Sequence, residues 1–160
     1  MKIVVLSDSH TDSIDRLPTK ILDELSGADL IVHAGDYTGT NLLEELRRRG
    51  NFKGVHGNMD PPEIKRELPA LETVVIGGFR IGVNHPSEGG TPFGIEERVG
   101  AKFRDVDAVI FGHTHRTKNE YRNGVLYFNP GSATGTFPAT AKTFGIITVG
   151  KEMRAEMLRV

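Results

Sequence analysis

Short apolar runs alternate with amphipathic segments through the first third of the chain. Ile3–Leu6 is β-branched and shows no alternation, which is typical of a strand buried on both faces. Similar strands are predicted over Asp29–Ala34 and Phe52–His56. The segments between them, Thr19–Ser26 and Asn41–Arg49, are predicted to be helices because each carries a helical pattern and is followed by a glycine. This β-α-β-α-β order indicates parallel strands covered by helices.

The second half of the chain is dominated by strand pairs joined by glycine-containing turns. Three hairpins are predicted: Leu71–Ile76 with Phe79–Asn84, Tyr121 with Val125–Phe128, and Thr143–Val149 with Met153–Leu158. A helix over Gly94–Phe103 and a buried strand over Ala108–Phe111 separate the first two hairpins. Pro86–Pro92 is rich in Gly, Ser and Pro and is expected to be a mobile loop. Since no linker or repeat interrupts the chain, residues 1–160 are expected to form one α/β domain.

Chemically reactive side chains collect directly after the predicted strands. Five strands end in a carboxylate, an imidazole or an amide, usually beside a glycine. In open α/β sheets, sites form at the carboxyl ends of the strands, so we expect these side chains to converge on one pocket. The seven residues are Asp8, His10, Asp36, Asn58, His85, His113 and His115.

Seven such groups need cations between them, because carboxylates repel one another and desolvated imidazoles need partners. Nitrogen and oxygen donors without sulfur suit Mn, Fe, Co, Ni or Zn better than Mg or Ca. The set is too large for one tetrahedral zinc ion and fits two ions that share a bridge. Asp8 and His10, like His113 and His115, are separated by one residue. The strand period of two would place both members of each pair on one side, where they can chelate.

Composition and charge exclude several other classes of protein. The formal net charge of −1 provides no basic field for nucleic acid or an acidic membrane surface. The absence of cysteine excludes disulfides, zinc-thiolate sites and thiol catalysis, and it fits a reducing compartment. The N-terminal apolar run is too short for a signal peptide or a membrane span, so a cytoplasmic location without a membrane partner is expected.

The ordered motifs resemble those of the calcineurin-like metallophosphoesterase superfamily. Its pattern is Asp-x-His, Gly-Asp, Gly-Asn-x-Asp, a lone His and Gly-His-x-His, and the chain carries all five from Asp8 to His115. The short length and the stretch Asn129–Ser132 look most like the small branch of YfcE-type phosphodiesterases. The resemblance implies a four-layer α/β/β/α sandwich of two mixed sheets. It also implies a homo-oligomer, either a dimer or a tetramer.

The resemblance further implies which residues hold each ion. A first metal would be held by Asp8, His10, Asp36 and His115, and a second by Asp36, Asn58, His85 and His113, with Asp36 bridging. Asp36, Asn58 and His85 are also expected to take part in catalysis. The two divalent ions are expected to be Mn, Ni, Fe or Zn.

The expected reaction is hydrolysis of a small phosphate ester by a hydroxide that the two ions activate. Many superfamily enzymes have a histidine after the Asn of Gly-Asn-x-Asp, which is thought to protonate the leaving group, but this chain has Met59. A thioether cannot donate a proton, so a diester with a good leaving group is the expected substrate. The alternative is a non-catalytic protein-interaction scaffold, like the retromer subunit of the same fold.

Several neighbouring polar residues are expected to support the site rather than bind metal. His33 and His56 precede the ligand turns and are expected to pack or to orient ligands. Asp60 is expected to brace its turn, and Asn129–Ser132 to shape the loop beside the site.

Overall fold

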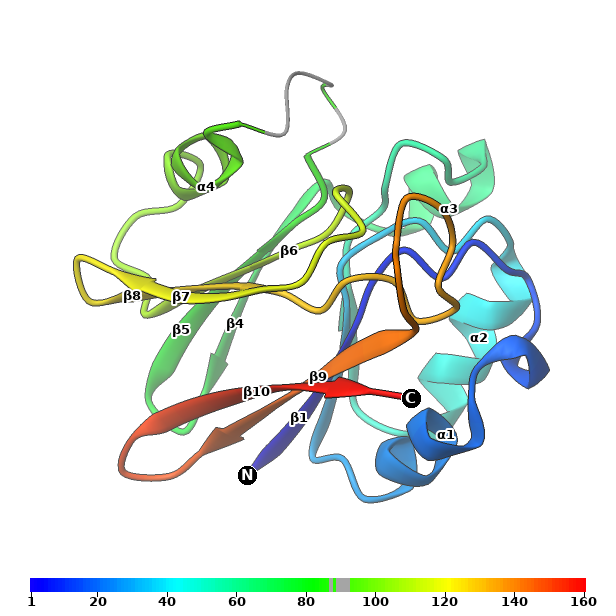
Figure 1. Cartoon of the computed structure of the whole chain (residues 1–160), viewed down its shortest axis with the longest axis horizontal. Helices are drawn as coiled ribbons and strands as arrows, with labels where there is room; N and C mark the ends of the chain where they lie inside the picture. Colours follow the sequence, from blue (N-terminus) through cyan, green and yellow to red (C-terminus); the bar gives the residue numbers. More distant parts are fainter. Residues whose placement is uncertain (87, 89–92) are drawn as a thin grey trace.

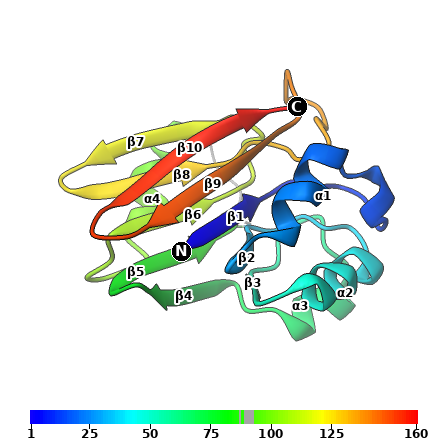
Figure 2. The ribbon, with the colours of Figure 1, turned by 90° about the horizontal axis from the view of Figure 1, so that it is seen from below.

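The structure is a computed structural model in which residues 1–86, 88 and 93–160 are described. Apart from Pro86 and Glu88, the segment expected to be a mobile loop, Pro86–Pro92, lies outside the described residues. Two five-stranded sheets lie face to face, as the view from below shows (Figure 2).

The first sheet has its parallel strands at one side and its antiparallel strands at the other. Its order is β10-β9-β1-β2-β3. The strands are β1 (Lys2–Leu6), β2 (Leu30–His33), β3 (Phe52–Gly54), β9 (Thr143–Val149) and β10 (Met153–Arg159). β1, β2 and β3 pair in parallel, whereas β9 pairs antiparallel with both β1 and β10. β1 is therefore the central strand, which explains the continuous apolar run in its sequence.

The second sheet is mixed as well, with the order β4-β5-β6-β8-β7. Its strands are β4 (Leu71–Ile76), β5 (Phe79–Asn84), β6 (Ala108–Phe111), β7 (Lys118–Arg122) and β8 (Val125–Asn129). The three predicted hairpins are confirmed as β4–β5, β7–β8 and β9–β10. β5, β6 and β8 are parallel to one another, so the second half contains more than the predicted hairpins.

Helices cover the outer faces of both sheets (Figure 1). α1 (Thr19–Ser26), α2 (Thr40–Arg49) and α3 (Pro62–Glu67) pack their apolar side chains on the first sheet, and α4 (Ile95–Gly100) packs on the second. A 3₁₀ helix, η1 (Ile14–Arg16), precedes α1. The four-layer α/β/β/α arrangement expected from the resemblance is therefore confirmed. α3 was not predicted, and α4 is shorter than the helix expected over Gly94–Phe103.

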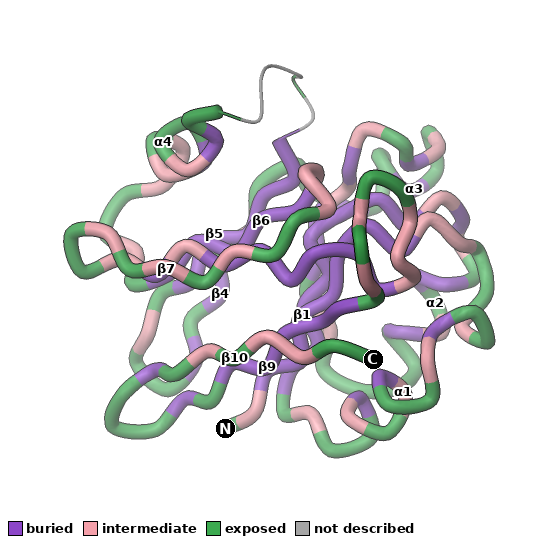
Figure 3. The backbone as a smooth tube through the Cα atoms, viewed as in Figure 1, coloured by how far each residue is buried: buried purple, intermediate pink, exposed green. Residues whose placement is uncertain are grey.

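The main core lies between the two sheets, and the strands at their centres, β1 and β6, are buried along almost their whole length (Figure 3). Alternation along β1 divides its side chains, since Ile3 and Val5 face this core while Val4 and Leu6 face the helices. Burying each such side chain stabilises the fold by roughly 1.5–3 kcal/mol. Among the described residues, no helix is both long and apolar enough to span a bilayer.

Candidate metal centre

The seven residues singled out in the sequence lie together at the carboxyl ends of strands from both sheets. Asp8 and His10 follow β1, Asp36 follows β2, and Asn58 comes after β3. The remaining three follow β5 and β6 of the second sheet; they are His85, His113 and His115. Contacts of 3.0–3.6 Å link all seven into one continuous group, so the predicted convergence is confirmed.

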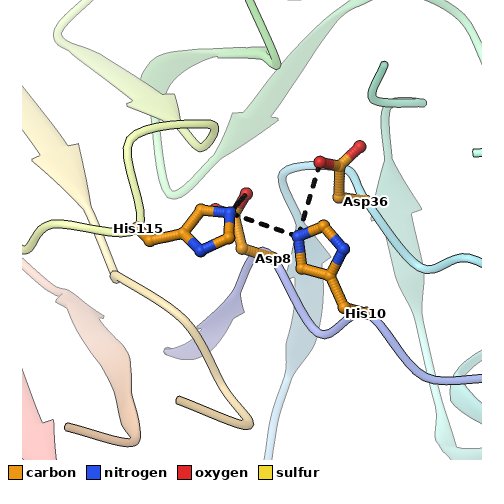
Figure 4. A group of neighbouring side chains, drawn as sticks. All are labelled: Asp8, His10, Asp36 and His115. Atoms are coloured by element: carbon orange, nitrogen blue, oxygen red, sulfur yellow. Dashed lines mark hydrogen bonds and ion pairs between the residues drawn. The ribbon is translucent and has the colours of Figure 1, made fainter. Parts of the chain in front are cut away.

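One part of this group, the first cluster, consists of Asp8, His10, Asp36 and His115 (Figure 4). Its ligand atoms all lie within 4.8 Å of one another. Nε2 of His115 is 3.2 Å from Oδ1 of Asp8 and 3.1 Å from Nε2 of His10. Nε2 of His10 is in turn 3.6 Å from Oδ2 of Asp36. Four potential ligand atoms therefore face one small volume, whereas structural zinc sites use four protein ligands and catalytic ones three.

The other part, the second cluster, consists of Asp36, Asn58, His85 and His113. Oδ1 of Asn58 lies 3.1 Å from Nε2 of His85 and 3.0 Å from Nδ1 of His113. Nε2 of His85 also lies 3.4 Å from Oδ2 of Asp36. The same carboxylate oxygen of Asp36 thus faces both clusters.

Backbone conformation, rather than strand pleating, aims these side chains. Five of the seven residues have positive φ, from 43° at His10 to 79° at His113. Left-handed backbone is uncommon outside glycine and concentrates at functional sites. The prediction that Asp8 and His10 can chelate together is confirmed, but left-handed backbone rather than a strand period of two brings them together. The same prediction for His113 and His115 is wrong. His113 and His115 belong to different clusters, because a left-handed turn directs their rings apart.

Hydrogen bonds to backbone carbonyls set the tautomers of two histidines. Nδ1 of His85 lies 2.7 Å from the carbonyl oxygen of Ala34, and Nδ1 of His115 lies 2.8 Å from that of Thr136. Each Nδ1 carries the hydrogen and donates it, which leaves a lone pair on Nε2. These lone pairs face other acceptors, such as Oδ1 of Asp8. Two hydrogen-bond acceptors that face each other need a cation or an extra proton between them. These nitrogen and oxygen lone pairs therefore fit divalent metal ions.

The protonation equilibria reflect the same crowding of acceptors. Burial lowers the pKa of His85, but the hydrogen bond to Asp36 and the charges of Asp8 and Asp36 together outweigh it, so the pKa lies above its ordinary value. Burial also lowers the pKa of His115, where the hydrogen bond to Asp8 and the nearby negative charges together raise it above the ordinary value. Burial raises the pKa of Asp36, yet the hydrogen bond and charge of a protonated His85, with the backbone N–H of Met59, keep it below the usual value. Burial lowers the pKa of His10 and His113, so both rings favour the neutral, metal-binding form.

Asp60 braces the turn that carries Asp36, as expected, and does so more extensively than its sequence position suggested. It is 3% exposed, and its two carboxylate oxygens accept four backbone N–H groups. The donors are those of Asp36, Tyr37, Thr38 and Gly57, at 2.6–3.1 Å. One buried carboxylate therefore holds the loops after β2 and β3 in register.

The other expected supporting residues lie where the sequence placed them. His33 accepts the N–H of Gly35 at Nδ1 and donates from Nε2 to Ser9 Oγ, so both ring nitrogens are used in hydrogen bonds beside the site. Nδ2 of Asn129 donates to the carbonyl of Gly112 and to Thr114 Oγ1, on either side of His113. Ser132 Oγ donates to the carbonyl of Asp8 at 2.7 Å. Nδ1 of His56 lies 3.4 Å from the carbonyl oxygen of Gly57, and the backbone N–H of His56 donates to the carbonyl of Pro69.

Backbone groups are the contributors that sequence reasoning missed. The carbonyls of Ala34 and Thr136 orient two histidines, and any residue type supplies a carbonyl, so no side-chain signal could reveal them. Close packing adds a requirement for small residues: a Cβ on Gly112 would lie 2.7 Å from the carbonyl of Ala34 and 2.9 Å from Nδ1 of His85.

Comparison with known protein families agrees with this geometry. Residues 1–152 match the family described as the calcineurin-like phosphoesterase superfamily domain. The chain belongs to this superfamily.

Its relatives within the superfamily include both named phosphoesterases and a sorting protein. A probable metallophosphoesterase of Methanocaldococcus jannaschii is 37% identical over 137 residues, which are 84% of this chain and 69% of the relative. A phosphodiesterase of the same organism is 25% identical over 174 residues and 99% of both chains. The crystal structure of Vps29 from Entamoeba histolytica complexed with Zn²⁺ superposes with a TM-score of 0.78 at 25% identity, covering 99% of both chains.

Proposed function

We propose that this chain is a metal-dependent phosphodiesterase that acts on a small phosphate ester. The observation that carries the proposal is the position of Asp36, whose Oδ2 faces Nε2 of His10 at 3.6 Å and Nε2 of His85 at 3.4 Å. One oxygen shared by two sets of acceptors is what a pair of cations with a bridging ligand requires. Membership of the superfamily and the relative named a phosphodiesterase support the same assignment.

We assign one ion to each cluster, with Asp36 shared. Divalent ions bound there would lower the pKa of water toward ~7 and neutralise charge on the phosphate. The chain itself holds the acceptors in place through left-handed turns, the carbonyls of Ala34 and Thr136, and the carboxylate of Asp60. We propose Asp36, Asn58 and His85 as catalytic residues, because Asp36 is shared by the two clusters, His85 lies 3.4 Å from it, and Asn58 lies 3.1 Å from His85.

Preference for diesters follows from the residue after Asn58. Met59 is 59% exposed, and its backbone N–H donates to Oδ1 of Asp36 at 2.9 Å. Met59 therefore lies directly beside the proposed bridging ligand. A thioether provides no proton to a departing alkoxide. Substrates with a good leaving group are therefore the ones that this site would cleave.

The decisive experiment compares bis-p-nitrophenyl phosphate with p-nitrophenyl phosphate in the presence of Mn²⁺. We expect faster turnover of the diester, and loss of turnover in Asp36→Asn by at least a factor of about 10³. Asp15→Asn changes an exposed carboxylate on η1 and serves as the matched control. Turnover that is insensitive to Asp36→Asn, or a faster monoester, would contradict the proposal.

A protein-interaction scaffold is the competing function, because a Vps29 protein is among the structural relatives. That structure contains Zn²⁺, so metal binding alone does not separate the two functions. A hydrolysis assay separates them, because a non-catalytic scaffold would show no phosphodiester turnover that depends on Asp36. The homo-oligomer and the cytoplasmic location expected from the sequence stay predictions.

A further inference from the structure

An open hollow of about 440 Å³ adjoins the first cluster at His10. Its volume lies within the usual range for small-ligand sites. The lining is polar throughout and contains no carboxylate: it consists of His10, Thr11, Arg16, Thr134, Thr136 and Lys142. Members of the second cluster do not line it, so the hollow is separate from the place where the two clusters meet.

The two cations in this hollow lack acidic partners. Elsewhere on the surface, cations pair with carboxylates, as Arg48 does with Glu44 and Glu45. Arg16 and Lys142 are both exposed, and no carboxylate of the described residues forms an ion pair with either. The hollow therefore carries uncompensated positive charge, although the whole chain is almost neutral.

Hydrogen bonds tie the wall of the hollow to the metal centre. Thr134 Oγ1 donates to the carbonyl of Ser9 at 2.7 Å, and Thr136 in turn donates its hydroxyl to Thr134. The carbonyl of Thr136 accepts from His115. Thr11 Oγ1 donates to the carbonyl of Ser13, so all three threonine hydroxyls of the lining are used and Arg16 and Lys142 are the charged groups left to bind an anion. The backbone N–H of Arg16 donates to the carbonyl of Ser13, and the carbonyl of Lys142 accepts from Val160. Backbone held in place in this way lowers the entropy cost of binding.

We propose that the substrate carries a second phosphate, which binds Arg16 and Lys142 while the scissile phosphodiester lies at the metal centre. This inference rests on the proposed phosphodiesterase function and adds the chemical class of its substrate. A guanidinium binds two phosphate oxygens at once, and an ammonium adds a point charge, so together they favour phosphate over a neutral group. A nucleotide diester with a further phosphate on its sugar has this chemistry.

The test uses two chromogenic probes that differ by one phosphate. Thymidine 5′-(p-nitrophenyl phosphate) has only the scissile diester, and its 3′-phosphorylated form has a second phosphate. For the unaltered protein with Mn²⁺, we expect kcat/KM to be about tenfold higher for the phosphorylated probe. In Arg16→Gln/Lys142→Gln we expect this ratio to fall close to one. Equal kcat/KM for the two probes in the unaltered protein would overturn the second-phosphate site.

Two control variants locate the effect. Arg49→Gln removes an exposed cation at the end of α2 and should keep the ratio. Arg116→Gln removes a cation from a separate hollow beside His115 and should also keep it. A ratio that collapses in Arg116→Gln and survives in the double variant would overturn the assignment to Arg16 and Lys142. Hydrolysis of neither probe would instead refute the proposed function.

Binding of inorganic phosphate provides a readout that does not need turnover. In metal-free protein, titration with phosphate should shift the backbone amide NMR signals of Arg16 and Lys142. The double variant should weaken the apparent affinity at least fivefold, whereas Arg49→Gln should leave it unchanged. Shifts of the same size and midpoint in the double variant would contradict the proposal, whatever the enzyme assays give.

Discussion

Nε2 of His10 lies 3.1 Å from Nε2 of His115, although 105 residues separate them in the chain. Two nitrogens bound to one ion at ~2.1 Å are roughly 3.0 Å apart at a right angle and roughly 3.4 Å apart at a tetrahedral angle. The observed separation lies within this range. The two rings are therefore positioned as ligands of a common ion.

Divalent metal should consequently stabilise the folded chain. At a free Mn²⁺ or Zn²⁺ concentration of 100 times Kd, we expect the Tm to rise by about 5–10 °C, which corresponds to about 2.7 kcal/mol for one site. Differential scanning fluorimetry with and without metal measures the shift. His10→Ala/His115→Ala should lose at least half of it, whereas His56→Ala, outside both clusters, should retain it. An equal shift in all three proteins would show that the metal binds elsewhere.

Replacing Met59 by histidine should restore a proton donor beside Asp36. We expect Met59→His to raise kcat about tenfold for a diester with a phenol leaving group, and less than threefold for one with p-nitrophenol, because only the poorer leaving group needs protonation. Steady-state kinetics on both diesters measures the difference. Met59→Gln controls for the change in side-chain polarity. Equal gains on the two substrates would exclude acid catalysis as the explanation.

Asp60→Asn should destabilise the fold by about 3 kcal/mol. Each oxygen of Asp60 accepts two backbone N–H groups, and an amide would turn one acceptor into a donor that faces two donors. Urea denaturation measures the loss. Asp15→Asn, on the exposed η1 turn, should stay within about 0.5 kcal/mol of the unaltered protein. A similarly small effect of Asp60→Asn would mean that the four hydrogen bonds contribute little.

His33 should make the metal-free protein less stable in acid. Burial lowers its pKa to about 3, so the folded state keeps it neutral while the unfolded state binds a proton below its ordinary pKa of 6.5. Stability is therefore complete above pH 6.5 and declines as the pH falls toward 3. Between pH 7 and 5 the unaltered protein should lose ~2 kcal/mol more than His33→Gln. Parallel pH profiles, or an NMR titration of His33 near pH 6.5, would contradict this assignment.

Local patterns were enough to predict most of the fold. The β4–β5 hairpin has the predicted bounds, because a glycine pair between two apolar runs specifies a turn from neighbouring residues alone. α3 was missed because it is six residues long and buries one side chain, Ile64, which provides no helical period to detect. Its formation depends on packing against the first sheet.

The sequence by itself determined which seven side chains could bind metal, because the chemistry of a side chain follows from its residue type alone. It also determined that they follow the strands, because local patterns mark where strands end. Tertiary structure decided how they meet. The N–H of His113 that donates to the carboxylate of Asp8, the carbonyl of Thr136 that orients His115, and the hollow lined by Arg16 and Lys142 all join segments far apart in the chain. Long-range contacts of this kind leave no periodic trace in a single sequence, because each depends on how two distant backbones are packed.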